Sequence, residues 1–144
     1  MRLRMREARG SDVESLRALM QDLNGHQLST QDMIGRLQFV EGSKADWLFV
    51  CEADGQAAGL LGFRIRENLE EASRFGEVPA IVVSTDERGK GVGRFMMDYA
   101  EKLASEMGCI GTWLVSGFGR EEPAHAFYKT LGYEITGYRF VKRF

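Results

Sequence analysis

The sequence has few of the residues that build metal sites and disulfide frameworks. Its 144 residues include two cysteines, Cys51 and Cys109, and two histidines, His26 and His125. The cysteines are too far apart for a C-x-x-C site, and these four residues match no zinc-site spacing. We therefore expect no metal and no disulfide framework. Cys51 lies in an apolar run and is expected to be a small buried hydrophobic residue.

Apolar runs of about 18 residues, the length that spans a membrane, are also absent. The N-terminus alternates arginine with apolar residues, which is typical of a strand and not of a signal peptide. The 19 basic and 21 acidic side chains give a net charge of -2, so the chain lacks the positive surface that nucleic acid requires. We expect one intracellular, cytoplasmic domain, residues 1–144, with no nucleic-acid or membrane partner.

The order of the apolar patterns predicts an α/β fold, with a mixed sheet and helices on both of its faces. Alternating or β-branched runs predict strands at 3–8, 47–52, 56–66, 81–83 and 110–115, and two more within 133–144. Apolar residues at helical spacing predict helices at 12–24, 30–42, 92–107 and 121–131. Asp54-Gly55 predicts the turn of a β-hairpin. Proline cannot donate to a strand ladder, so Pro79 predicts a bulge in the central strand.

A glycine-rich basic turn, residues 88–94, lies between that strand and an amphipathic helix. Its spacing matches neither the P-loop, G-x-x-x-x-G-K-[ST], nor the dinucleotide fingerprint, G-x-G-x-x-G. Glycines nevertheless let the backbone approach a ligand closely, and a helix N-terminus supplies unpaired N–H donors and the positive end of the helix dipole. The turn therefore predicts a phosphate site; the alternative is an ordinary strand–helix connection.

Two motifs together resemble the GNAT-type N-acetyltransferase family. The first is R-G-x-G-x-G at 88–93, and the second is A-x-x-F-Y-x-x-x-G-[FY] at 124–133. The resemblance implies the acyl-CoA N-acyltransferase fold, with acetyl-CoA as cosubstrate and its pantetheine arm inserted beside a bulged central strand. Residues 76–142 also look similar to bacterial small-amine acetyltransferases, among them the aminoalkylphosphonate enzymes. The implied cosubstrate site consists of Ile81, Val82, Val83, Arg88, Gly89, Lys90, Gly91, Val92, Gly93 and Arg94.

The family reaction is direct attack of a primary amine on the acetyl thioester. The resemblance implies that Tyr128 serves the departing thiolate; the alternative is a core aromatic residue beside Phe127. It also implies that backbone N–H groups around residues 81–83 stabilise the oxyanion.

The amine must lose a proton, because a protonated amine has no lone pair with which to attack. Many relatives carry a glutamate within the central strand, where this sequence has Ala80 and Ile81. Glu77, at the start of the strand, is the nearest acid and our candidate base, acting through water; it could equally be a strand-end carboxylate. His125 is a weaker candidate, and His26 is expected to be a solvated loop residue.

Several assignments stay open at this stage. The charged loop at 67–76 is expected to be a solvated face, with a rim that attracts cationic amines as the alternative. Arg120 and Lys129 could contact an anionic substrate tail or CoA. The expected partner is a small-molecule amine, and a homodimer is left open. Alternative functions are acetylation of a protein lysine or N-terminal amine, and a sensor that binds acyl-CoA without turnover.

Overall fold

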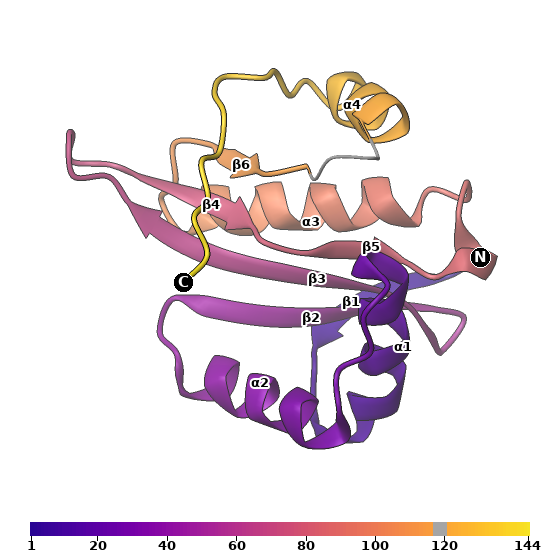
Figure 1. The fold of residues 1–144 in the computed structure, drawn as a ribbon. Coiled ribbons are helices and arrows are strands. Elements are labelled where there is room, and N and C mark those ends of the chain that lie inside the picture. Colours follow the sequence, from indigo (N-terminus) through magenta and orange to yellow (C-terminus); the bar gives the residue numbers. More distant parts are fainter. Residues whose placement is uncertain (117–120) are drawn as a thin grey trace. The chain divides into compact units, whose positions relative to one another are not determined.

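The computed structural model describes residues 1–116 and 121–144, with side chains described for 1–116 and 123–144. This part of the chain forms two compact units, Met1–Trp113 and Leu114–Phe144. The first unit contains nearly all of the sheet, and the second contains one helix and the C-terminal tail (Figure 1). The expectation of a single domain over the whole chain stays a prediction.

The expected mixed α/β architecture is confirmed. In the described residues six strands form one sheet in the order β1-β2-β3-β4-β6, with β5 paired to β3. The strands are β1 (Leu3–Glu7), β2 (Asp46–Ala53), β3 (Gln56–Glu67), β4 (Arg74–Val78), β5 (Ile81–Val83) and β6 (Thr112–Leu114). The α-helices are α1 (Val13–Asn24), α2 (Thr30–Gly42), α3 (Val92–Glu106) and α4 (Glu121–Thr130). Short 3-10 turns lie at Gly10–Asp12 and Thr85–Glu87.

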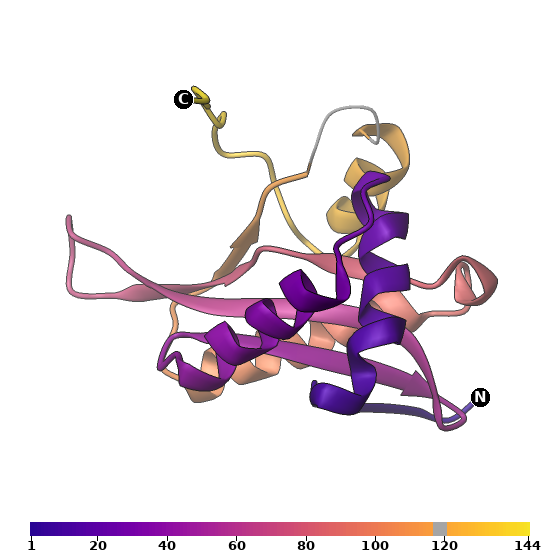
Figure 2. The same cartoon turned by 60° about the horizontal axis from the view of Figure 1, so that its bottom comes forward.

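Helices cover both faces of the sheet in the first unit, as the sequence predicts. Figure 1 shows α3 on one face and α1 and α2 on the other, and Figure 2 shows α1 and α2 side by side. Leu16 of α1 and Met33 of α2 pack with Leu60 of β3 and Val82 of β5 in one buried cluster. The α1 and α2 side of β5 is therefore filled with apolar side chains. None of the helices in the described chain is both long and apolar enough to cross a membrane.

The β2–β3 hairpin confirms the predicted turn. Asp54 and Gly55 both have positive φ, 50° and 83°, as the two central residues of a type I′ turn require. Cys51, in the β2 arm, is fully buried, and burial raises the pKa of its thiol to about 11. Cys51 is therefore a core residue and not a nucleophile, as expected.

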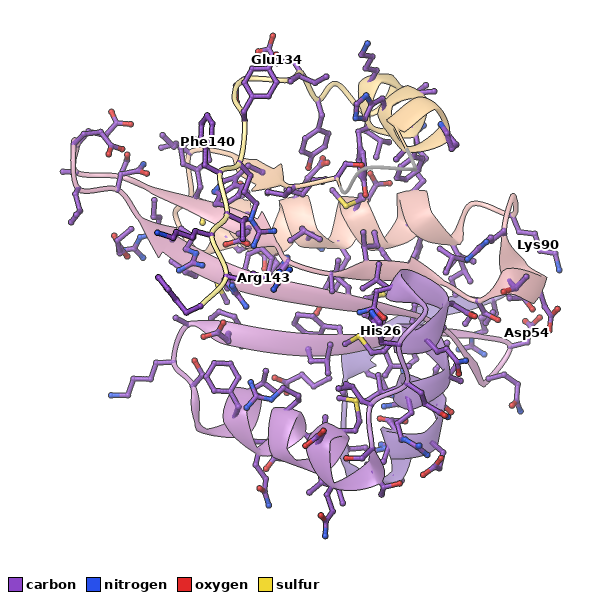
Figure 3. All side chains as sticks on the ribbon, viewed as in Figure 1. His26, Asp54, Lys90, Glu134, Phe140 and Arg143 are labelled. Atoms are coloured by element: carbon purple, nitrogen blue, oxygen red, sulfur yellow. The ribbon has the colours of Figure 1, made fainter. Side chains whose placement is uncertain are left out.

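Two predicted features are wrong. The charged loop expected at 67–76 is shorter, because β3 extends to Glu67 and residues 74–76 belong to β4, where Gly76 is buried. The described residues 133–144 contain no strand, although their apolar residues alternate. Tyr138 and Phe140 are 90% and 93% exposed; Phe140 is labelled in Figure 3. Alternation favours a strand only where a neighbouring strand accepts the hydrogen bonds and a core takes the apolar side chains. Alternation by itself therefore does not make this segment a strand.

Candidate active site

The central strand is interrupted where Pro79 stands. On β3 three residue steps separate Leu61 from Arg64, while their partners Ile81 and Glu77 are four steps apart on the facing strand. One extra residue is therefore inserted, which confirms the predicted bulge. The β3 residue opposite the bulge is closely approached by the proline ring: a Cβ on Gly62 would lie 3.1 Å from Cγ of Pro79, so a larger residue would require that ring to shift by a few tenths of an ångström.

The bulge leaves one edge of β5 open. Ala80 C=O accepts from Gly62 N–H at 2.8 Å, and Ser84 N–H donates to Ala58 C=O at 2.7 Å. The N–H and C=O groups of successive residues point to alternate edges of a strand. The backbone groups of Val82 therefore also face β3, while those of Ile81 and Val83 face the opposite edge. Among the described strands, only β3 pairs with β5. The open edge can therefore bind an extended ligand that carries its own amide groups.

This pattern separates the three predicted strand residues. The side chain of Val82 is 5% exposed and lies in the core, and its backbone is used by β3. Ile81 and Val83 alone present backbone groups at the open edge. The sequence could not show this difference, because it depends on which edge of β5 the partner strand occupies.

The glycine-rich turn follows directly and ends in a helix start without a side-chain cap. Gly89 and Gly91 have positive φ, 78° and 86°, and Gly91 is the N-cap of α3. Phe95 N–H bonds to Gly91 C=O at 3.0 Å, so the N–H groups of Val92, Gly93 and Arg94 precede the first intrahelical bond. No side chain caps this end and no acidic residue lies in the first turn. Such a helix start is suited to a phosphate group.

Cationic side chains surround this helix start. Arg88, Lys90 and Arg94 are all exposed, and Figure 3 shows Lys90 pointing outward from the turn before α3. Arg88 Nε donates to Val83 C=O at 3.4 Å, and Lys90 Nζ lies 3.3 Å from Oε2 of Glu87. An exposed ion pair of this kind is weak, so Lys90 remains available to an anion. Val92 is 1% exposed and can contribute only its backbone N–H.

Glu77, the predicted base, lies two residues before Pro79 and is 8% exposed. Its Oε1 accepts from Arg66 Nε at 2.7 Å, and its Oε2 lies 3.9 Å from Nη1 of Arg64. The carboxylate is thus already held by two arginines, which the sequence analysis missed. The two arginines alternate with apolar residues in β3, but only the strand register reveals that they face Glu77.

Tyr128 and His125 belong to α4 in the second unit. The Tyr128 ring is partly buried and packs edge-on against Phe127 and Tyr133, with centroids 5.1 and 6.1 Å apart. Its predicted role at the thiolate stays a prediction. Lys129 is exposed in the same helix, and Arg120 lies outside the described residues. His26 is exposed after α1, as expected (Figure 3).

A surface cavity lies elsewhere on the first unit. None of the predicted site residues lines it. Its lining consists of Lys44, Ala45, Trp47, Ile65, Glu67, Arg74 and Met107.

A bulged strand with an open edge, followed by an uncapped glycine-rich helix start, is an arrangement suited to a phosphorylated ligand with an extended arm. Residues 13–133 match the Acetyltransferase (GNAT) family, and the chain belongs to that family. It is therefore an acetyltransferase, as the two motifs predict.

Known proteins are similar to this chain in sequence or in fold. The chain is 28% identical to aminoalkylphosphonate N-acetyltransferase of Salmonella typhimurium over 144 residues, 96% of this chain and 89% of the relative. A transcriptional regulator from Bacillus halodurans shares the fold at a TM-score of 0.90, with 20% identity over 99% of this chain and all of that one. Aminoglycoside N-acetyltransferase AAC(6')-Iy in complex with CoA has a TM-score of 0.84, with 18% identity over 99% and 94%.

Proposed function

We propose that this enzyme transfers the acetyl group of acetyl-CoA to the primary amine of a small molecule. The observation that carries the proposal is the continuity of the open β5 edge with the uncapped start of α3. Pantetheine carries two amides and is followed in CoA by a pyrophosphate. Ile81 and Val83 would pair with the amides, and the 88–94 turn would hold the pyrophosphate.

The reaction is direct attack. The amine nitrogen attacks the thioester carbonyl carbon, and the carbonyl oxygen becomes an oxyanion. The C–S bond then breaks, CoA leaves as the thiolate, and the nitrogen gives up a proton. The Ile81 N–H, at the end of the open edge next to the bulge, is the proposed oxyanion donor.

Two side chains have proposed proton roles. Glu77 would accept the amine proton, since its carboxylate lies beside the bulge. The transfer would pass through a water molecule, because Arg66 already binds one oxygen of that carboxylate. Tyr128 would donate to the thiolate. The donor meets a charge that exists only as the thioester breaks, so it would stabilise the transition state more than the ground state.

The acceptor is proposed to be a small molecule, with aminoalkylphosphonates as the first candidates, because the Salmonella typhimurium relative is named for that substrate. The test is release of free thiol from acetyl-CoA with a panel of small amines, with a lysine peptide, and without acceptor. Thiol release that depends on a small amine supports the proposal. Release with the peptide alone indicates a protein acetyltransferase, and tight acetyl-CoA binding without release indicates a sensor.

A further inference from the structure

A row of alternating charges crosses the sheet beside the bulge. Asp46, Arg64 and Glu77 are direct cross-strand partners on β2, β3 and β4. Because cross-strand partners share a face, all three lie on the same face as Leu60 and helices α1 and α2. Arg64 Nε lies 3.1 Å from Asp46 Oδ1.

Arg66 extends this row and differs from Arg64 in one respect. It lies two residues further along β3, hence on the same face, and only its Nε is engaged, by Glu77 at 2.7 Å. Its Nη1 and Nη2 have no hydrogen-bond partner among the described residues, and its side chain is 52% exposed. Guanidinium is a planar fork that binds phosphonate or carboxylate oxygens through two parallel hydrogen bonds. Arg66 therefore offers an open anion-binding edge in contact with the proposed base.

We propose that Arg66 binds the acidic group of the acceptor, so that the enzyme selects small primary amines that carry a phosphonate or carboxylate over amines without an acid. The inference rests on the proposed function, since it assigns one end of the same acceptor. Because Arg66 and Glu77 are in contact, a ligand whose amine approaches Glu77 and whose acid reaches Arg66 needs only a few bonds between the two groups. Short aminoalkyl acids meet this requirement.

The charge balance of the row favours the same class of acceptor. Arg64 is matched by Asp46, and Arg66 by Glu77. An acceptor with both an ammonium and an acid adds one partner for Glu77 and one for Arg66, so each charge stays paired. A monoamine without an acid gains nothing from Arg66, and a diamine places a second cation against it.

The test compares 2-aminoethylphosphonate with propylamine, an amine of similar length without the acid, in the thiol-release assay. Arg66→Gln is expected to lower kcat/KM for 2-aminoethylphosphonate about 10- to 100-fold, mainly through KM, the scale of a lost charge-assisted bidentate contact. Propylamine should lose much less, because it has no group for the guanidinium to bind, and any loss that arises through the Glu77 carboxylate, which Arg66 holds, is common to both amines. Arg66→Lys should recover part of the loss, since it keeps the charge without the fork.

The matched control is Arg74→Gln. Arg74 pairs with Glu67 at 3.1 Å across the same two strands, but Glu67 follows Arg66 in β3, and the pair therefore lies on the opposite face. This variant should leave both amines unaffected. An equal loss for both amines in Arg66→Gln would overturn the inference, because Arg66 would then act only through Glu77 or the fold.

Failure of the proposed function can be distinguished from failure of this site. If no amine releases thiol, the proposal of acetyl transfer to small amines is wrong. Calorimetric titration of 2-aminoethylphosphonate into the CoA-loaded protein then tests the Arg66 site by binding alone. If the wild type binds 2-aminoethylphosphonate and Arg66→Gln does not, the Arg66 site is still supported. Equal binding, or none to the wild type, would refute it.

Discussion

Gly91→Asp is the most direct test of the phosphate site, and the chain supplies its own control. Gly91 and Gly108 lie at the two ends of α3, with positive φ of 86° and 78°. A Cβ at either position would meet no heavy atom within 4 Å. Both Asp substitutions therefore add the same side chain in the same left-handed conformation, without a clash.

The expected stability losses can be worked out from these facts. The left-handed conformation costs an Asp about 1–2 kcal/mol at each site. The helix dipole then favours Asp near the N-terminus and disfavours it near the C-terminus by about 0.3–1 kcal/mol each. Gly108→Asp should therefore be the more destabilising by about 0.6–2 kcal/mol, or about 1–8 °C in Tm at about 2–4 °C per kcal/mol.

Acetyl-CoA should reverse this order. A ligand at 100 times its Kd stabilises the folded chain by about 2.7 kcal/mol, or about 5–11 °C. Gly108→Asp should keep this thermal shift, whereas Gly91→Asp should lose it, because a carboxylate at the helix start repels the pyrophosphate and occupies its place. The assay is thermal unfolding of the three proteins with and without acetyl-CoA. A folded Gly91→Asp protein with an unchanged shift would refute the phosphate assignment.

Three further predictions concern individual side chains. Tyr128→Phe should lower kcat about 10²- to 10⁴-fold with little change in Tm or acetyl-CoA affinity; a joint loss of stability and affinity would show that the ring is only structural. Glu77→Gln should lower turnover most at low pH, where the amine is protonated, and a loss of equal size at every pH would argue against a base. The Arg6 guanidinium donates to both oxygens of buried Asp12 at 2.8 Å and lowers the pKa of that carboxyl. A lowered folded-state pKa adds stability above the unfolded value of about 3.9 that is lost as the pH falls below it. Asp12→Asn should therefore destabilise the protein at pH 7. It should also reduce the loss of unfolding free energy, measured with urea, between pH 5 and about pH 2; an unchanged loss over this pH range would contradict the prediction.

Local chemistry was enough to predict much of the site. Gly89 and Gly91 were expected where the backbone has to approach a ligand, and both adopt positive φ. Asp54-Gly55 forms the predicted hairpin turn, and Pro79 marks the bulge. Each of these signals acts over a few neighbouring residues, because ring closure, a missing N–H or a missing Cβ restricts the backbone directly.

Pairing between strands distant in the sequence determines the remaining features of the site. Val82 is a core residue while Ile81 and Val83 face the open edge, because β3 occupies one particular side of β5. Arg66 reaches Glu77 because the register of β3 and β4 brings residues 11 positions apart onto the same face. Apolar and polar residues alternate in 133–144 as in a strand, yet these residues form none. An alternating pattern becomes a strand only where another strand pairs with it. Backbone restrictions are properties of the sequence itself, whereas edges, registers and ion pairs exist only once strands distant in the sequence have met.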